Sequence, residues 1–345
     1  MNITIVTDAW LPQVNGVVRT LRRTIEELAI LGHRVEVIAP DGFRTVPCPT
    51  YPEIRLALLP GREVARRLRT SAPDAVHIST EGPLGLAARR ACLRDGLAFT
   101  TAYHTRFPEY VRARAPLPLS AGYAAMRWFH GPAARTLVPT PSMLRTLEDH
   151  GLRNLALWGR GVDTETFRPR RKDFLDLPRP VWLYFGRVSV EKGVEEFLRL
   201  DLPGSKLVVG DGPATGMLQR RYPEATFAGY RHGEELASFI AASDVFVFPS
   251  RTDTFGLVLL EAMACGIPVA AYPVTGPLDV VRNGVTGMLH EDLAVAALGA
   301  LELDPADCRA HAMRHSWAAA TRQFVAALAP SPRYCGEAAA SAAGS

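Results

Sequence analysis

The sequence predicts an α/β protein built from two consecutive doubly wound parallel sheets. Three observations carry this prediction. Short β-rich runs alternate with helical patterns through most of the chain, which is typical of parallel strands joined by helices. The length of 345 residues exceeds the ~250–300 residues at which a single hydrophobic core stops growing. A proline-rich, charged stretch at 166–180 interrupts the alternation, which then begins again.

The expected elements follow from local pattern. Ile3–Thr7 is predicted as a buried strand and Val17–Leu31 as an amphipathic helix that ends at Gly32. Further strands are expected in the first half at Arg34–Ala39, Ala75–Ser79, Phe99–Tyr103 and Thr136–Thr140. Strands are expected in the second half at Val181–Phe185, Lys206–Val209, Thr226–Ala228, Val245–Phe248 and Pro268–Tyr272, and helices at Leu293–Leu301 and Trp317–Leu328. The predicted organisation is a domain at 1–165, a linker at 166–180, a domain at 181–310, a helix at 311–328 and a flexible tail at 329–345.

Composition excludes several protein classes. Hydrophobic residues make up 48% and charged residues 21% of the chain, which excludes wholesale disorder. The five cysteines contain no C-x-x-C pair, so neither a zinc site nor a disulfide framework is expected. No signal peptide and no apolar run of the ~18 residues needed for a membrane span is expected. We therefore expect a cytoplasmic protein, with attachment to a membrane surface left open.

Charge is unevenly distributed along the chain. The net charge is +4, but the first half is basic and the second half is acidic, which suggests two lobes with different partners. Only Lys172, Lys192 and Lys206 are lysines among the 39 basic residues. A biased genome composition explains this scarcity simply, yet it makes each lysine worth locating.

Two loops that follow predicted strands could bind an anion. In Thr7–Val17, Gly16 opens a helix whose N-terminal N–H groups and dipole favour negative charge; the alternative, an ordinary turn glycine, has about even weight. In Phe185–Gly193, Arg187 and Lys192 could converge on a polyanion. The alternative there is a solvated loop with a Glu191–Lys192 pair.

A third loop, Val209–Gly216, nearly matches the fingerprint of dinucleotide-binding proteins. Its spacing is G-x-G-x-x-x-G, it does not follow the first strand of either predicted sheet, and no strand-end carboxylate lies about 20 residues later. We therefore interpret it as a turn that lines the ligand-binding cleft and not as a hydride-cofactor site.

The strongest motif runs from Pro249 to Pro268, where a strand ends and a helix begins near Phe255–Gly256. Eight positions separate Asp253 from Glu261, which places the two carboxylates on one side of the helix, roughly 10–12 Å apart. That gap suits one carboxylate holding a sugar hydroxyl and the other a ribose, with a diphosphate on the free N–H groups between them. The alternative makes Asp253 a helix N-cap and Glu261 a buried residue with a partner. The cost of burying a carboxylate in so apolar a stretch favours the functional interpretation.

His104 follows the strand Phe99–Tyr103, at the sheet edge where ligands bind. A structural histidine with satisfied hydrogen bonds is an equally weighted alternative.

Taken in order, these motifs resemble the family 4 retaining glycosyltransferases of the GT-B fold, over roughly residues 1–328. The resemblance rests on T-D-x-x-x-P-x-x-N-G-V at 7–17, G-R…E-K-G at 186–193, V-G-D-G-P at 209–213 and the E-x7-E type motif at Asp253…Glu261. The segment 161–169 also looks like the family's inter-lobe segment. The resemblance implies two Rossmann-like domains that face each other across a cleft, the first for the acceptor and the second for the nucleotide-sugar donor. It also implies a C-terminal helix that crosses back to the first domain.

The resemblance implies roles for individual residues. Arg187 and Lys192 would neutralise the donor diphosphate, Glu261 would bind the ribose, Asp253 would hold the donor sugar, and His104 would contact that sugar near its anomeric side. The implied donor-binding residues are Asn15, Gly16, Tyr230, Arg231, Phe255, Gly256, Leu257 and Val258, with the base near Tyr230–His232, and the implied acceptor-binding residues are Asp8 and Arg106. The chain departs from the pattern by having Asp253 in place of a glutamate, which shortens the side chain that meets the sugar. No metal or other cofactor is expected, because the GDP- or UDP-linked sugar is the substrate.

The resemblance implies retaining transfer of a mannosyl, glucosyl or glucuronosyl unit to an acceptor hydroxyl. The expected acceptor is a membrane lipid such as diacylglycerol or a glycolipid; the alternatives are a soluble or polysaccharide acceptor, or a GT-B sugar-nucleotide epimerase. Arg62, Arg66 and Arg69 share one predicted helix face, and residues 106–135 mix arginines with aromatic residues, which suits an anionic membrane surface. A solvated arginine-rich surface over core aromatics has equal weight. The expected location is therefore the cytoplasm, with peripheral attachment to the inner face of the cytoplasmic membrane, and no nucleic-acid partner is expected.

Overall fold

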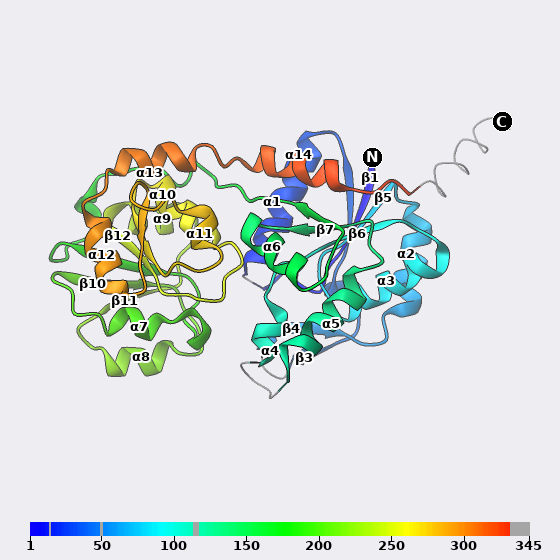
Figure 1. The fold of residues 1–345 in the computed structure, drawn as a ribbon, viewed down its shortest axis with the longest axis horizontal. Coiled ribbons are helices and arrows are strands. Elements are labelled where there is room, and N and C mark those ends of the chain that lie inside the picture. Colours follow the sequence, from blue (N-terminus) through cyan, green and yellow to red (C-terminus); the bar gives the residue numbers. More distant parts are fainter. Residues whose placement is uncertain (14, 49–50, 113–116, 332–345) are drawn as a thin grey trace. The chain divides into compact units, whose positions relative to one another are not determined.

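The computed structural model describes residues 1–13, 15–48, 51–112 and 117–331. The chain divides into two compact units (Figure 1). The first contains Met1–Gly159 together with the segment from Trp317 onward, and the second contains Arg160–Ser316. Each unit is built around its own six-stranded sheet. The predicted fold class, two doubly wound α/β domains, is confirmed.

The first unit has a parallel sheet in the order β2-β1-β5-β6-β7-β8. Its strands are β1 (Asn2–Val6), β2 (Arg34–Ile38), β5 (Ala75–Ile78), β6 (Phe99–Ala102), β7 (Arg135–Val138) and β8 (Leu155–Leu157). A separate antiparallel hairpin pairs β3 (Thr45–Cys48) with β4 (Tyr51–Ala57). The helices are α1 (Gly16–Ile30), α2 (Gly61–Ser71), α3 (Pro83–Asp95), α4 (Phe107–Arg112), α5 (Leu119–His130), α6 (Pro141–Asp149) and α14 (Trp317–Ala327). The reversal of strand order between β1 and β5 makes a topological switch point at the carboxyl edge of this sheet.

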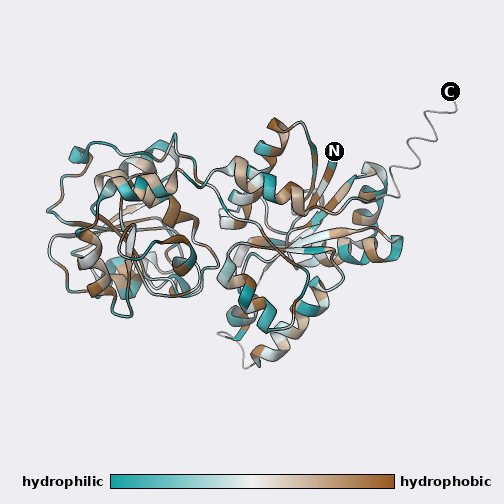
Figure 2. Ribbon diagram, turned by 45° about the horizontal axis from the view of Figure 1, so that its top comes forward, coloured by the Kyte–Doolittle hydropathy of each residue, from teal (hydrophilic) through white to brown (hydrophobic). Residues whose placement is uncertain are grey.

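Alternating side chains of the first sheet supply two separate cores. Ile3 and Ile5 belong to a core with residues of α1 and α14, whereas Val6 belongs to a core with residues of α2 and α3. Figure 2 shows strands of more apolar residues between helices of mixed hydropathy. The helix α14 is part of this unit, because Phe324 is fully buried and its ring lies 5.0 Å from that of Trp158. The return of the C-terminal helix to the first unit is therefore confirmed.

The second unit has a parallel sheet in the order β11-β10-β9-β12-β13-β14. Its strands are β9 (Val181–Phe185), β10 (Ser205–Val209), β11 (Thr226–Gly229), β12 (Val245–Phe248), β13 (Val269–Ala271) and β14 (Gly287–Leu289). Its helices are α7 (Val194–Leu198), α8 (Thr215–Arg221), α9 (Gly233–Ala242), α10 (Leu257–Ala264), α11 (Pro277–Val280), α12 (Leu293–Leu301) and α13 (Pro305–Ala312), with short 3₁₀ turns at Pro40–Gly42, Lys172–Phe174 and Val190–Lys192 along the chain. When the six strands are numbered along the chain, their order across the sheet is 3-2-1-4-5-6. The switch point therefore lies between β9 and β12.

The stretch 166–180, predicted as a linker, lies inside the second unit. The Asp244 carboxylate accepts hydrogen bonds from Lys172 at 2.6 Å, Arg179 at 2.7 Å and the backbone N–H of Val181 at 2.8 Å. These contacts hold residues 166–180 to the end of α9. The sequence did not predict this, because the prolines and charges of 166–180 give no periodic pattern. The division between the units falls instead between Gly159 and Arg160.

The C-terminal part also differs in detail from the sequence prediction. The helix expected at 311–328 is two helices, α13 and α14, separated by residues 313–316. In the expected tail at 329–345, Pro330 bridges to Ala75 and the N–H of Ser331 donates to the carbonyl of Asp74 at 2.8 Å. Residues 332–345 lie outside the described part of the chain.

Four strands were not predicted. Pro47 lies within β3 and Pro52 within β4. A proline argues against a strand in sequence analysis because it has no backbone N–H to donate to the neighbouring strand. The strands β8 and β14 are only three residues long, too short for a periodic signal to show.

Candidate active site

Glycine-rich loops meet backbone to backbone at the carboxyl edge of the second sheet. A Cβ added to Gly210 would lie 1.9 Å from the carbonyl oxygen of Gly186, and one added to Gly212 would lie 2.3 Å from that of Val188. Gly210 also has a φ of +140°, which side chains rarely adopt. The loop 209–216 therefore supports the loop that carries Arg187 and Lys192, in keeping with its interpretation as a structural turn.

Lys192 and Asp253 form an ion pair at the switch point. The ammonium Nζ of Lys192 lies 2.6 Å from Oδ1 of Asp253, and the two side chains are 26% and 19% exposed. The other oxygen of Asp253, Oδ2, is buried and accepts no hydrogen bond. The structure thus brings together two candidate residues that are 61 positions apart in the chain, and leaves a carboxylate oxygen that can accept a further donor.

The N-cap residue of α10 has no side chain with which to cap the helix. It is Gly256, with φ of +79°. Asp253 is therefore not the N-cap, and the structural alternative from the sequence is wrong for this residue. The first N–H groups of an α-helix have no intrahelical partner, so the half-buried Leu257 and Val258 leave an amide-lined, positive helix end beside the ion pair.

Glu261 lies in the second turn of α10 and is only 4% exposed, and Phe255 is 8% exposed in the core beneath the helix start. Arg187 is half-buried, and its carbonyl accepts a hydrogen bond of 2.6 Å from the hydroxyl of Tyr184. Burial raises the pKa of Tyr184 well above its usual value, and the charges of Asp253 and Glu191 raise it further. Tyr184 is therefore neutral, and its hydroxyl holds the backbone of Arg187 in place.

Tyr230 and Arg231 follow β11 on the same sheet edge. The ring of Tyr230 is 52% exposed and lies parallel to that of His232, with centroids 6.0 Å apart. Arg231 pairs with Glu235 at 2.9 Å. The two exposed rings could stack on a nucleobase.

Asp8 lies at the switch point of the first sheet, where it caps α3. Its carboxylate accepts hydrogen bonds from the N–H of Leu84 at 2.8 Å, the N–H of Gly85 at 3.3 Å and the hydroxyl of Thr80 at 2.8 Å. A Cβ on Gly82 would lie within 2.5 Å of this carboxylate. Burial raises the pKa of Asp8, although these hydrogen bonds oppose the shift. The carboxylate therefore has a structural use that the sequence did not predict.

The loop after β1 is organised by Asn15. Its side chain accepts from the N–H groups of Val17 and Val18 at 3.0 Å, so it is the N-cap of α1. Gly16 is exposed at the start of that helix. Two of the first-turn amides of α1 are thus already satisfied, whereas the N-cap residue of α10 is a glycine with no side chain.

His104 and Arg106 follow β6. His104 is half-buried, with its ring edge-on to Trp158 at 5.7 Å. Arg106 donates to Glu109 at 2.9 Å. Both residues lie at the carboxyl edge of the first sheet.

Several residues near the ion pair were missed by the sequence analysis. Ser189 and Ser250 are 4% and 1% exposed, and neither hydroxyl has a hydrogen-bond partner. The guanidinium of Arg251 lies 3.5 Å from the ring centre of Tyr272, whose hydroxyl donates to Glu196 at 2.5 Å. The only sequence signal for these residues is their nearness to Lys192 and Asp253, or their place just after a strand.

Part of the predicted basic and aromatic surface is core. Tyr123 and Phe129 are almost fully buried, whereas Phe107 and Trp128 are 49% and 58% exposed. The aromatic set therefore divides between packing and surface. Arg114 and the side chain of Tyr110 lie outside the described parts of the structure.

The described residues contain neither a cluster of metal ligands nor a membrane-spanning helix. No group of three or more His, Cys, Asp or Glu side chains in these ranges could hold a metal ion. No helix among them has the length and hydropathy that crossing a membrane requires.

Comparisons with known proteins match both units. A model of Glycosyltransferase Family 4 matches residues 14–166, and a model of Glycosyl transferases group 1 matches residues 179–302. A GDP-mannose-dependent alpha-mannosyltransferase of Mycobacterium tuberculosis is 33% identical over 84% of this chain and 83% of its own length. Its namesake of Corynebacterium glutamicum is 32% identical over 84% of this chain and 76% of its own length. Sucrose-phosphate synthase of Thermosynechococcus elongatus has the same fold, with a TM-score of 0.74 at 22% identity over 94% of this chain and 97% of its own.

Proposed function

The chain belongs to glycosyltransferase family 4 and is a hexosyltransferase of the GT-B fold, and from this premise we propose that it is a retaining transferase that uses GDP-mannose. Three relatives that each match 84% of the chain are named GDP-mannose-dependent alpha-mannosyltransferases, which supports this donor. HepE of Anabaena, which shares the fold with a TM-score of 0.70 at 16% identity over 94% of this chain and 98% of its own, was solved with UDP and glucose. A UDP-sugar is therefore the donor to test against it.

The observation that carries the proposal is the Lys192–Asp253 pair beside the start of α10, where a glycine holds the N-cap position. A nucleotide sugar presents a diphosphate next to a hexose. The ammonium of Lys192, the guanidinium of Arg187 and the amides of Leu257 and Val258 supply positive charge for the diphosphate. The free Oδ2 of Asp253 supplies an acceptor for a sugar hydroxyl, and Glu261, in the second turn, is assigned the ribose.

The proposed reaction follows from where charge develops. The bond between the anomeric carbon and the diphosphate oxygen breaks, and the acceptor oxygen bonds to the same carbon on the same face. The acceptor proton passes to the departing diphosphate. Lys192 and Arg187 stabilise the negative charge that grows on the leaving group, which is where fixed positive charge lowers a barrier most.

Roles for the remaining candidates are part of the proposal. Tyr230 and Arg231 flank the nucleobase, and Phe255 with Gly256 shapes the sugar end. On the first unit, Asn15 caps α1 and so holds the loop that carries Gly16; we assign the N–H of Gly16 to the diphosphate and His104 to the sugar. Because Asp8 is engaged at α3, we assign the acceptor side to Arg106 in preference to Asp8.

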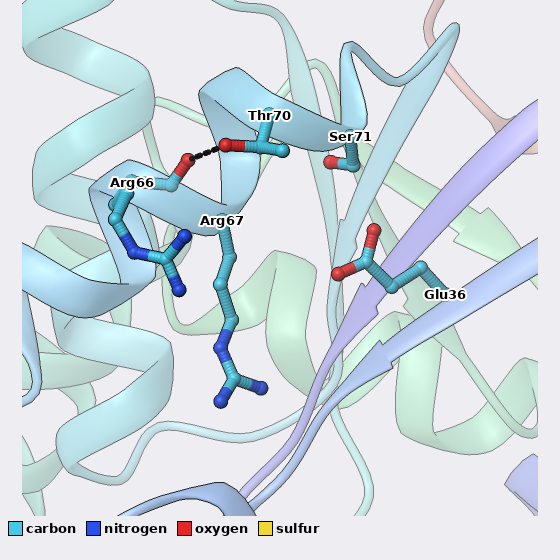
Figure 3. Close-up of a pocket in the computed structure, with 5 residues that line it drawn as sticks. All are labelled: Glu36, Arg66, Arg67, Thr70 and Ser71. Carbon is cyan, nitrogen blue, oxygen red and sulfur yellow. Dashed lines mark hydrogen bonds between the residues drawn. The ribbon is translucent and has the colours of Figure 1, made fainter.

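We further propose that the first unit docks on an anionic membrane that holds the acceptor. Arg62, Arg66 and Arg69 are exposed on α2, while Val64 and Leu68 of the same helix are buried. Figure 3 shows Arg66 and Arg67 extending from α2 into a surface pocket that Glu36 also lines. Basic side chains with adjacent apolar groups favour the interface of anionic bilayers.

The turn before α2 supplies the apolar part of this surface. Leu58 is 50% exposed and Leu59 is 97% exposed. Leu59 also has φ of +48°, a conformation that costs a side chain about 1 kcal/mol or more. In water, the exposed side chain of Leu59 makes no contact that would offset this conformational cost. Burial of the side chain among acyl chains would contribute about 2 kcal/mol to membrane binding.

Nucleotide binding and transfer test the donor assignment. Isothermal titration of the full chain with GDP, UDP, GDP-mannose and UDP-glucose should give the tightest binding for the GDP compounds, and mannose should appear in product only with an acceptor present. Tighter binding of UDP would reassign the donor. Isomerisation of the sugar nucleotide without acceptor would instead identify an epimerase.

Vesicle co-sedimentation tests the membrane assignment. Phosphatidylglycerol vesicles should retain the protein far better than phosphatidylcholine vesicles. Arg62→Ala with Arg69→Ala should weaken that binding about 25-fold, from about 1 kcal/mol per basic side chain. The matched control, Arg171→Ala with Arg220→Ala on the second unit, removes two exposed arginines and should leave binding unchanged. Equal, weak binding to both lipids would favour a soluble or polysaccharide acceptor.

A further inference from the structure

The first sheet ends in a strand with a free edge. Among the described residues, β2 pairs only with β1. The N–H of Arg34 donates to the carbonyl of Met1 at 2.9 Å, so the backbone groups of Arg34 point toward β1. Because backbone groups alternate in direction along a strand, those of Val35 and Val37 point away from β1. The edge therefore presents donors and acceptors that a further strand could bind.

The strand β2 is regular enough to pair with another chain. Its register with β1 is unbroken from Arg34 to Ile38, so it has no bulge, and it contains no proline. It does carry two exposed charges, Arg34 and Glu36. Charged side chains usually protect an edge strand from association. These two have opposite signs, however, and lie two positions apart on one face of the strand, so they could pair with each other between two copies.

Neither charge is used within the chain. Over the described ranges, no ion pair joins Arg34 or Glu36 to another side chain. Figure 3 shows the carboxylate of Glu36 projecting from the sheet beside α2, near Ser71. Both side chains are therefore available to a partner at the edge.

Antiparallel pairing of two β2 strands has one register that suits these charges. When Val35 lies opposite Val35 of a second copy, the two residues can exchange both hydrogen bonds, because their backbone groups face the edge. Arg34 of each copy then lies opposite Glu36 of the other, with Cβ atoms about 4.5–5.5 Å apart. The next hydrogen-bonded register is centred on Glu36 and places two glutamates opposite each other, which is destabilising. Charge thus selects the register centred on Val35.

Exposed apolar side chains lie at the same edge. Ile30 and Leu31, in the turn before β2, are 78% and 42% exposed, and Val35 and Val37 are partly exposed. In an antiparallel pair, the amino end of one β2 lies beside the carboxyl end of the other. Burial of these side chains against the second copy would therefore add to the backbone hydrogen bonds.

We propose that two copies of this chain associate through β2, in the register centred on Val35, and join their first sheets into one continuous sheet. Such a contact is isologous, so it closes as a dimer. Its two-fold axis is perpendicular to the sheet, which places α2 of both copies on the same side. The dimer does not depend on the proposed function. If α2 docks on a membrane, the dimer presents two such surfaces to one bilayer and binds it more tightly.

Sedimentation equilibrium of the full chain over a wide concentration range tests the proposal. The wild type should show a reversible monomer–dimer equilibrium. Arg34→Glu and Glu36→Arg should each raise its dissociation constant about tenfold or more, because each turns two attractive cross-strand pairs into repulsive ones. The double variant restores opposite charges and should dimerise within about threefold of the wild type.

Matched controls reverse exposed charges elsewhere on the first unit. Arg90→Glu on α3 and Glu148→Arg on α6 change the net charge equally and should dimerise as the wild type does. A wild type that stays monomeric at every concentration would overturn the proposal. So would a dimer that survives both single reversals, or a double variant that stays as weak as the single ones.

Hydrogen exchange resolved to single amides locates the interface independently. The N–H groups of Val35 and Val37 should exchange more slowly as protein concentration rises, whereas that of Glu36, which faces β1, should not change. Slowing at β8, the opposite edge of the sheet, would place the interface elsewhere and refute the proposal. If the dimer forms but phosphatidylglycerol vesicles do not retain the protein, the membrane assignment fails and the dimer stands.

Discussion

Replacing Lys192 by alanine tests the proposed donor site most sharply. The substitution removes a cation that lies 2.6 Å from Asp253 at the switch point. Removing one preorganised charge-stabilising donor costs about 10²–10³ in kcat, or about 2.7–4 kcal/mol of transition-state stabilisation. Because both side chains are about a quarter or less exposed, removing Lys192 leaves a largely buried carboxylate unpaired and should cost the fold about 1–3 kcal/mol. Thermal unfolding of the variant separates this loss of stability from the loss of turnover.

The chain offers a matched control for this experiment. Lys172 also lies 2.6 Å from a carboxylate, that of Asp244, in the same unit, but it is away from the switch point and 44% exposed. Lys172→Ala should change stability by less than about 1 kcal/mol and leave turnover within about twofold of wild type.

The assay measures mannosyl transfer at saturating donor, GDP affinity by titration calorimetry and thermal unfolding of each variant. Lys192→Arg should recover part of the lost turnover, because it restores charge with a different shape. Turnover of Lys192→Ala within tenfold of wild type, or an equal loss in Lys172→Ala, would refute the assignment of the diphosphate to this loop.

Three further predictions concern the framework. Phe324→Ala should destabilise the first unit by about 3–5 kcal/mol, because it empties a fully buried position in the core shared with α1; urea unfolding followed by tryptophan fluorescence measures this, and a loss below about 1 kcal/mol would contradict the packing role of α14. Gly210→Ala should prevent the second unit from folding normally, since its Cβ would lie 1.9 Å from the Gly186 carbonyl; GDP binding and near-ultraviolet circular dichroism report the outcome, and wild-type affinity would disprove it. The stability of Asp8→Asn relative to wild type should increase as pH rises. Burial raises the pKa of Asp8 in the folded protein above its value in the unfolded chain. Protonation of Asp8 therefore stabilises the wild-type fold fully below pH about 4, and this stabilisation is lost as pH rises through the higher folded pKa. Urea unfolding of both proteins at pH 4.5 and 7.5 measures that difference, and a constant difference would show that the shift is absent.

The sheets could be predicted from sequence because their strands carry a strong local signal. Val181–Phe185 and Val245–Phe248 were predicted with the bounds that the structure has, since continuous buried apolar runs are typical of strands covered on both faces. The hairpin β3–β4 was not predicted, because its prolines hide the alternation.

The arrangement of the second unit's site depended on facts that sequence does not record. The sequence allowed Asp253 to be a helix cap or a ligand-binding carboxylate, with the second favoured. The conformation of Gly256 excludes the first, because Gly256 holds the cap position one residue before α10 and Asp253 pairs with Lys192. For the first unit, the carboxylate of Asp8 gave no sign of its contacts with Thr80, Leu84 and Gly85, since they lie more than 70 positions away.

The three lysines show that the type of a charged residue and its contacts do not suffice to assign its role. Its position in the fold is also needed. Lys172 and Lys192 each contact a carboxylate at 2.6 Å, and Lys206 donates to the carbonyl of Leu198 at 2.7 Å. Neither the rarity of lysine nor the length of a contact distinguishes them. Strand order does, because Lys192 alone among them follows β9, the strand at which the order of the second sheet reverses. An acidic unit can therefore bind a polyanion, since the local field at the helix start and the switch point, and not the net charge, determines what binds there.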